Sequence, residues 1–305
     1  MTVLDIAVNP VGLEEEYIDA ANRCFGHWGD ATTYRWAFKR EVGAPAADLL
    51  VLRRRGELVA GSAVSYRRLA RAGGGDVLVG IMTGSWTLPA ARGQGCFTTI
   101  IEESRRLTRE RGGAALLAFV TRDNASCRRL LEAGGGGVPT SYVYSTVATP
   151  PPDGDGPRPE PVGYGDAAVA ELLPEWERAR ERANHFSYAT PSAWRGQFLD
   201  RPLPVEVLSV GAGSWGVIER ADTTDRLLLL VQAVDAELTE EQVLASVLAW
   251  TRCRGRQLFI FSMAPTRTAA AARLGLEVKP GLLTVLPADP DWITGPWHLE
   301  GGDRI

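Results

Sequence analysis

The sequence contains little that points to a membrane, a metal or an oxidising environment. No apolar run approaches the roughly 20 residues that a membrane-spanning helix needs, and the first ten residues lack the basic start and apolar stretch of a signal peptide. The cysteines lie far apart, show no metal-ligand spacing and are typical of free thiols in a reducing compartment: Cys24, Cys96, Cys127 and Cys253. We therefore expect a cytoplasmic protein that contacts no membrane and holds no metal.

Lysine is almost absent, so arginine carries nearly all of the positive charge; the two lysines are Lys39 and Lys279. Residues 1–150 hold 18 Lys+Arg against 15 Asp+Glu, and residues 151–305 hold 15 against 22. A mildly basic first half suits a phosphate-bearing ligand, and the acidic second half could attract a cationic amine, although chance surface variation explains the asymmetry equally well. The net charge of −4 gives little footprint for nucleic acid.

The length indicates two domains, because 305 residues exceed the roughly 100–200 of one typical domain. A Pro-rich segment over residues 149–161 cannot continue a helix or a central strand. We therefore predict a domain over residues 1–148, a linker over 149–161 and a second domain over 162–305.

The periodicity predicts the same order of elements in both halves. In the first half we expect helices at 13–25, 32–40, 96–111 and 125–133, and strands at 48–54, 57–68, 77–88, 114–120 and 142–147. In the second half we expect helices at 167–184, 239–254 and 265–274, and strands at 205–210, 214–220, 226–234, 257–262 and 281–285. This order predicts an α/β protein with a mixed sheet, built from an internal repeat of about 150 residues.

A Gly-rich loop joins the third long strand of the first half to an amphipathic helix. Gly93 and Gly95 remove side chains that would block a diphosphate, and the first turn of the helix adds free N–H donors and the positive end of its dipole. Arg92 adds charge at the rim. The counterpart in the second half, residues 234–238, has no glycine and two acids, so it would repel a pyrophosphate.

This loop and its surroundings resemble the GNAT acyltransferase superfamily. The resemblance rests on Leu88-Pro89-Ala90-Ala91-Arg92-Gly93-Gln94-Gly95-Cys96-Phe97, followed by a helix, a strand and Asn124. It covers roughly residues 1–148, and residues 160–305 only as an order of elements. It implies two tandem GNAT-like domains, the second degenerate, with acetyl-CoA or another acyl-CoA as co-substrate. The residues it implies for coenzyme A are Thr87, Leu88, Arg92, Gly93, Gln94, Gly95, Cys96, Phe97 and Asn124.

Three positions depart from the family pattern. Phe97 stands where a small residue is common, although a Gly-x-Phe variant occurs in some tandem members. Leu131 occupies the position of the Tyr that serves many members as general acid. The strand before the loop, residues 77–87, has no acid where many members carry a Glu base.

Other residues are therefore candidates for proton transfer. Asp30 lies in a polar–aromatic loop with His27, although it could instead cap the next helix. Tyr142 lies on the last strand of the first half and could serve as acid or as core, and His185 is either catalytic or a packed histidine. Residues 292–303 form an aromatic and acidic tail that could fold over the cleft or simply dock.

The resemblance implies an enzyme, an N-acyltransferase that acts on a primary amine of a small molecule such as an amino sugar, an amino acid or an antibiotic intermediate. We expect direct transfer in a ternary complex, with Cys96 packed under the helix rather than acting as nucleophile, by a monomer or homodimer. Two alternatives are open. One is an aminoacyl-tRNA-dependent transferase resembling the Fem proteins, and the other is a non-catalytic sensor with the same fold.

Overall fold

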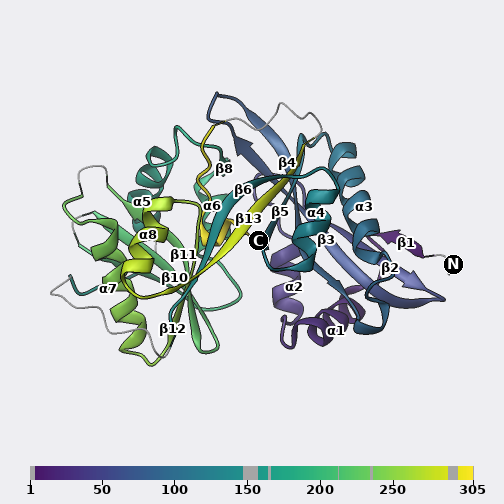
Figure 1. Ribbon diagram of the computed structural model, residues 1–305. Helices are drawn as coiled ribbons and strands as arrows, with labels where there is room; N and C mark the ends of the chain where they lie inside the picture. The colour runs from purple at the N-terminus through teal and green to yellow at the C-terminus, as the bar shows by residue number, and fades with distance from the viewer. Residues whose placement is uncertain are drawn as a thin grey trace.

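The strands of the protein form one continuous mixed sheet (Figure 1). The computed structural model describes residues 4–146, 157–163, 166–211, 213–233, 236–287 and 295–304. Over these residues the sheet has 13 strands in the order β1-β2-β3-β4-β5-β13-β6-β12-β11-β10-β9-β7, with β8 paired to β3. The α/β class with a mixed sheet is confirmed.

The first half contains the expected elements in the expected order. They are β1 (Asp5–Val8), α1 (Glu14–Phe25), α2 (Ala31–Phe38), β2 (Asp48–Arg54), β3 (Glu57–Ala70), β4 (Asp76–Thr87), the 3-10 turn η1 (Pro89–Ala91), α3 (Cys96–Glu110), β5 (Ala115–Thr121), α4 (Ala125–Glu132) and β6 (Gly136–Tyr144). β1 was not predicted, and β6 begins six residues earlier than expected. Gly137 belongs to β6 because its missing side chain leaves room for Leu282, whose methyl carbons would lie 3.3 Å from a Cβ there.

The second half adds three short elements that the periodicity does not show. Its elements are β7 (Glu160–Val162), α5 (Asp166–Arg178), β8 (His185–Ser187), α6 (Pro191–Phe198), β9 (Val205–Ser209), β10 (Ser214–Ala221), β11 (Thr224–Gln232), α7 (Glu240–Arg252), β12 (Gln257–Ser262), α8 (Pro265–Arg273), β13 (Glu277–Pro287) and the 3-10 turn η3 (Gly301–Arg304). The unexpected ones are β7, β8 and α6. Most of the predicted linker, residues 149–156, lies outside the described residues, and its end contributes to β7.

The last strand of each half pairs with strands of the other half. β13 lies between β5 and β6, antiparallel to both, with Leu283 opposite Phe119 on one side and Val138 on the other. β6 in turn pairs with β12, where Val143 faces Ile260. The two halves are therefore joined by strand pairing. The division at residues 148 and 162 stays a prediction, and neither half keeps its final strand to itself.

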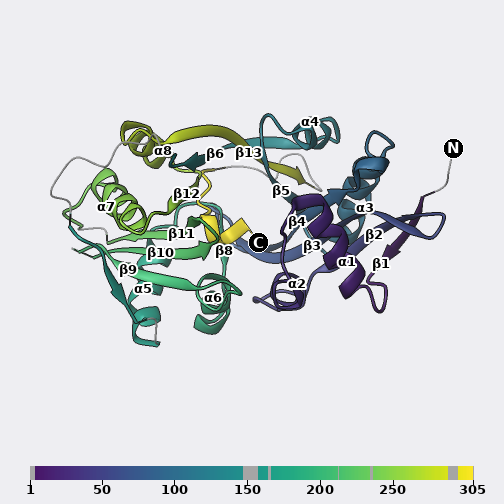
Figure 2. The same ribbon diagram turned by 90° about the horizontal axis from the view of Figure 1, so that it is seen from below.

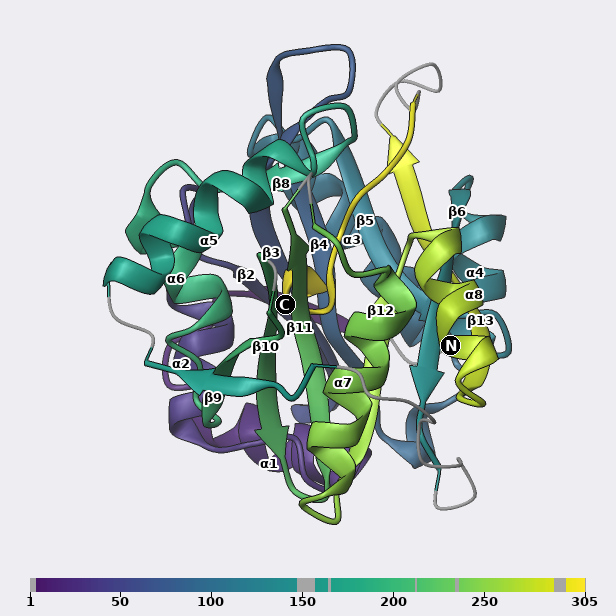
Figure 3. The same cartoon turned by 90° about the vertical axis from the view of Figure 1, so that its left-hand side faces the viewer.

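Helices cover both faces of the sheet (Figures 2 and 3). α1, α2, α5 and α6 pack on one face, which we call the acceptor face, and α3, α4, α7 and α8 pack on the other, the loop face. Alternation along the strands explains the division: Leu117 and Tyr142 join the core of the acceptor face, whereas the adjacent Leu116 and Val143 join the loop face. None of the described helices is long and apolar enough to span a membrane.

Candidate functional site

A cleft passes through the sheet where β4 and β5 separate. The two parallel strands pair only from Val79–Ile81 to Ala115–Leu117. Beyond that point β4 continues along β3 to Thr87, and β5 continues along β13 to Thr121. The unpaired ends of β4 and β5 line a cleft of about 780 Å3.

A bulge in β4 separates the two strands. The register between β3 and β4 shifts between Gly61 and Ala63, so that Gly84 and Ser85 on β4 lie opposite the single residue Ser62, and β4 carries one extra residue. Gly84 has φ +57°, a conformation that favours glycine. The bulge bends β4 away from β5 and places Ser85 on the cleft wall.

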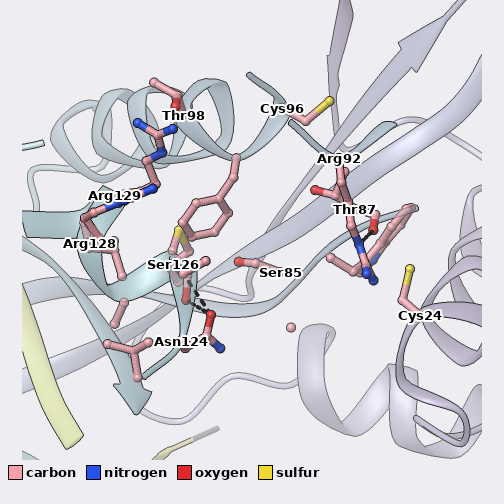
Figure 4. A pocket seen from close by; sticks show the side chains of 18 of the residues that line it. Cys24, Ser85, Thr87, Arg92, Cys96, Thr98, Asn124, Ser126, Arg128 and Arg129 are labelled. Atoms are coloured by element: carbon pink, nitrogen blue, oxygen red, sulfur yellow. Dashed lines mark hydrogen bonds between the residues drawn. The ribbon is translucent and has the colours of Figure 1, made fainter. Parts of the chain in front are cut away.

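The Gly-rich loop forms one mouth of the cleft (Figure 4). Gly93 and Gly95 have φ +74° and +84°, and a Cβ at either would meet no protein atom within 4 Å. Gly95 is the N-cap of α3, which has no side-chain cap and no acid in its first turn. The first-turn N–H groups therefore remain available to an anion. Arg92 lies at the rim, where its Nε donates to the Thr87 carbonyl oxygen at 3.3 Å.

α4 contributes a second helix terminus to the same mouth. The side-chain oxygen of Asn124 accepts from the Ser126 backbone N–H at 3.0 Å and from its hydroxyl at 2.8 Å. Asn124 therefore caps α4, and its Nδ2 has no partner in the part of the chain that the structure describes. Arg128 and Arg129 line the cleft on the next turn, and both lie near Glu132, at 3.6 and 2.9 Å.

The charge that faces the cleft is positive. Four arginines line it: Arg92, Arg128, Arg129 and Arg304. No Asp, Glu or His is among the described residues that line it. Within the described part of the chain, no group of three His, Cys, Asp or Glu could hold a metal. The cleft thus favours an anionic ligand, and the acids of the second half offer no attraction to a cationic amine inside it.

Known structures share this architecture, although no family model and no curated protein matches the sequence. A tandem GNAT protein from the clavulanic acid biosynthesis pathway aligns over 95% of this chain and 100% of its own, with a TM-score of 0.68 at 14% identity. This chain has a tandem GNAT fold. Saccharomyces cerevisiae N-myristoyltransferase with bound myristoyl-CoA aligns over 94% of this chain and 83% of its own, with a TM-score of 0.68 at 10% identity. A GCN5-related N-acetyltransferase from Kribbella flavida aligns over 93% of this chain and 71% of its own, with a TM-score of 0.59 at 13% identity.

The tandem GNAT fold brings most of the predicted coenzyme A residues to the cleft. Those that line it are Thr87, Arg92, Gly93, Gly95, Cys96, Phe97 and Asn124. Two predicted residues, both within the described ranges, lie elsewhere. Leu88 packs against the core under α1 and α2, and Gln94 is exposed, with its side-chain amide donating to the Ala90 carbonyl at 2.8 Å. Contact of any of these residues with coenzyme A stays a prediction.

The three proposed catalytic residues lie in different places. Tyr142 lines the cleft on the acceptor face, where burial raises the pKa of its hydroxyl, so the group stays protonated at neutral pH. Asp30 is the exposed N-cap of α2, and its carboxylate accepts from the Thr33 N–H at 2.9 Å. His185 packs edge-on to Trp176, with its Nδ1 2.9 Å from the Ala183 carbonyl oxygen. Asp30 and His185, although described, do not line the cleft, because one caps a helix and the other is held by β8.

Several cleft residues were missed by sequence reasoning. Cys24 and Phe25 come from the end of α1, Phe119 from β5 and Ser85 from the bulge. Periodicity assigns each of them only to an element, because the cleft depends on how β4 and β5 diverge. Arg304 carries no sequence signal at all, since it reaches the cleft from the last residues of the chain.

Proposed function

We propose that this protein transfers an acyl group from acyl-CoA to a primary amine of a small molecule, by direct transfer within a ternary complex and without nucleic acid. The observation that carries the proposal is the cleft through the sheet. One mouth is an uncapped helix N-terminus with two glycines at positive φ. The cleft is lined by arginines and by no acid among the described residues.

The loop mouth suits the diphosphate and the pantetheine arm. The N–H groups at the start of α3 and the side chain of Arg92 can bind the diphosphate. The pantetheine arm has amides of its own, and the unpaired edges of β4 and β5 offer it backbone partners, as in the addition of a strand to a sheet. Asn124 Nδ2 supplies one further donor at this mouth.

The chemistry requires little from the protein beyond positioning. The amine nitrogen forms a bond to the thioester carbon, the C–S bond breaks, and the sulfur leaves with the electron pair. A thiol ionises near pH 8.5, so the leaving group needs only weak assistance, which we assign to the protonated hydroxyl of Tyr142 on the cleft wall. The amine proton passes to water, because no carboxylate or imidazole lines the described cleft wall.

The thioester carbonyl needs a hydrogen-bond donor near the end of β4. The N–H of Leu88 donates to the Val59 carbonyl oxygen at 2.9 Å and is not free to polarise a thioester carbonyl. Ser85 is a better candidate, because it lines the cleft at the bulge and is held by Ser62, with 2.7 Å between the two hydroxyl oxygens. We assign the polarising hydrogen bond to Ser85.

The cysteines at the cleft support direct transfer. Cys96 is buried, and its thiol points to the Ala91 carbonyl oxygen at 3.7 Å. Burial raises the pKa of Cys24, so this thiol is a poor nucleophile at neutral pH. We therefore propose no acyl-enzyme, since the Cys24 thiol is not activated and Cys96 is buried at the start of α3.

Titration calorimetry with coenzyme A, acetyl-CoA and bulk tRNA in separate experiments tests the binding step, and thiol release in the presence of primary amines tests the transfer. We expect coenzyme A to bind, tRNA not to bind, and thiol release to depend on amine. Binding of tRNA alone would favour the Fem-like alternative and reject the proposal.

One observation favours a second candidate, a non-catalytic acyl-CoA sensor. The cleft wall has no Asp, Glu or His in its described part, so a conventional general base is missing. The sensor predicts tight acyl-CoA binding with no thiol release above the rate of buffer for any amine, whereas the enzyme predicts release that saturates with amine concentration.

A further inference from the structure

A single arginine from the C-terminal segment reaches the cleft from the acceptor face. Arg304 ends η3, which lies near the middle of the molecule between the two halves (Figure 2). Its guanidinium carbon is 4.8 Å from the ring centre of Tyr142, 5.2 Å from that of Phe261 and 5.5 Å from that of Phe259. These rings lie on β6 and β12, on the opposite face of the sheet from α3 and α4.

The charge of Arg304 has no counterion within the described residues. Among the described residues, its Nε is buried without a hydrogen-bond partner and its guanidinium forms no ion pair. The neighbouring acid, Asp303, is already engaged: its carboxylate accepts from Tyr188 at 2.8 Å and pairs with Arg180 at 3.3 Å. Burial lowers the pKa of Arg304, so the site disfavours its positive charge until an anion binds.

The backbone that carries Arg304 is held firmly. The Asp303 carboxylate also accepts from the Glu300 N–H at 2.8 Å, which closes η3 on itself. Gly302 packs so closely on Phe198 that a Cβ would lie 2.6 Å from its ring, and its carbonyl accepts from Gln197. The guanidinium is thus presented to the cleft from a rigid support, as a binding group requires.

We propose that Arg304 binds a carboxylate of the acceptor, so that the substrates of this protein are amines that also carry a carboxylate, such as amino acids. This inference rests on the proposed function and specifies its acceptor. The planar guanidinium lies among aromatic rings and can present paired N–H donors to a carboxylate.

The position of Arg304 separates it from the arginines at the loop mouth. Arg128 and Arg129 lie on α4, on the loop face, and Arg92 follows η1 at the same mouth. Arg304 lies beside Tyr142 on the acceptor face, beyond the point where β4 and β5 separate. A neutral acceptor would leave a partly buried cation unpaired, so the site selects against it.

The test compares amino acids with their carboxamides, for example L-phenylalanine with L-phenylalaninamide, across a panel of side chains. The wild-type protein should prefer the acid in kcat/KM by at least about 10-fold, the value of a charge-assisted hydrogen bond. Arg304→Gln and Arg304→Met should reduce this preference to about 2-fold or less, and Arg304→Lys should restore part of it. Arg254→Gln is the matched control, because the Arg254 guanidinium also lies over an aromatic ring, 3.4 Å from the Trp250 ring centre, but does not line the cleft.

A binding experiment makes the result independent of turnover. Calorimetry on coenzyme-A-saturated protein compares N-acetyl amino acids with their amides, and only the acids should bind, with at least about 10-fold loss in Arg304→Gln. Equal binding of acid and amide, or the same preference in Arg304→Gln, overturns the inference while coenzyme A binding and thiol release still support the proposed function. Failure of coenzyme A to bind instead overturns the proposed function. A coenzyme A affinity and a thermal unfolding midpoint equal to those of the wild type would show that the variants fold.

Discussion

In each half a helix follows the corresponding strand, β4 or β11, but the N-termini of the two helices are capped differently. α3 follows β4, and its N-cap is Gly95, with no side-chain cap and no acid in its first turn. α7 follows β11, and its N-cap is Thr239, whose capping box with Gln242 satisfies the first-turn N–H groups; Glu240 and Glu241 occupy the first turn. One terminus is free to bind an anion, whereas the other is closed by its own side chains and repels one.

The space beside the strands that precede these helices also differs between the halves: it is open in the first half and filled in the second. Beside β4 and β5 there is a cleft, but η3 packs against β11 and α6 in the second half. Gly301 lies so close to β11 that a Cβ would be 2.3 Å from the Leu227 carbonyl oxygen. The two halves thus differ at the equivalent position: one leaves the helix N-terminus uncapped beside a cleft, whereas the other caps it and packs η3 against its strands.

The largest expected effect comes from placing a carboxylate in the open terminus. Gly95→Asp or Gly93→Asp should weaken coenzyme A binding by about 1000-fold, about 4 kcal/mol, because like charges would lie a few ångströms apart at a partly exposed site. Gly95→Ala separates backbone strain at φ +84° from charge and should weaken binding far less. Ala236→Asp, before α7, is the matched change in the second half and should leave affinity unchanged.

Calorimetry with coenzyme A measures all four variants, and circular dichroism confirms that they fold. An unaltered dissociation constant in Gly95→Asp would remove the loop from the binding site. Weakened binding in Ala236→Asp would mean that the two termini are not functionally different.

A smaller effect concerns the segment that closes the second half. Burial alone would raise the pKa of Glu300, but Arg267 and His298 lower it from 4.5 to about 2. Because the pKa is depressed in the folded state, the stabilisation is complete above the unfolded value of 4.5 and is lost as the pH falls towards 2. At 1.36 kcal/mol per pKa unit, the free energy of unfolding should fall by about 3 kcal/mol.

Urea denaturation at several pH values between 6 and 2 measures this loss. Glu300→Gln has no charge to protonate, so its stability should depend less on pH over the same range. An identical pH dependence in the wild type and Glu300→Gln would show that Glu300 does not anchor the segment.

Removing the helix caps should lower stability without changing coenzyme A binding. Thr239→Ala at α7 and Asp30→Ala at α2 should each lower the free energy of unfolding by about 1 kcal/mol, because each removes the acceptor for a first-turn N–H. Coenzyme A affinity and kcat should stay within about 2-fold of wild type. Denaturant unfolding and steady-state kinetics test both, and a large drop in kcat for Asp30→Ala, with stability intact, would return Asp30 to the list of catalytic residues.

The smallest effect is expected for Cys96. Cys96→Ala should keep most of the activity, because the thiol packs under α3 rather than facing the acyl carbon. Mass spectrometry of the protein incubated with acetyl-CoA alone should show no added acyl mass. An adduct on Cys96 that an amine discharges would replace direct transfer with a two-step mechanism.

The order of elements could be predicted because it depends on local patterns. The periodicity of α3 and the glycines that follow it define that helix, and the apolar run of β5 defines a buried strand. The short β7 and β8 were missed because three residues carry no periodicity, and they form only where a neighbouring strand offers a register. Gly93 and Gly95 could be proposed from the sequence because their chemistry is local, whereas the prediction for His185 could not draw on its surroundings, which come from α5 and β8.

The sequence by itself determined the α/β class and the repeat and predicted an anion-binding Gly-rich loop, because glycines, caps and apolar spacing act within a few residues of one another. Only the tertiary structure decided where the last strands pair, how far β4 separates from β5 and which side chains line the cleft. Those outcomes depend on contacts between residues far apart in the chain, such as Arg304 with Tyr142 and Leu283 with Phe119. Such contacts cannot be read from the spacing of residues along the sequence, because that local spacing is the same whichever distant residue becomes the partner.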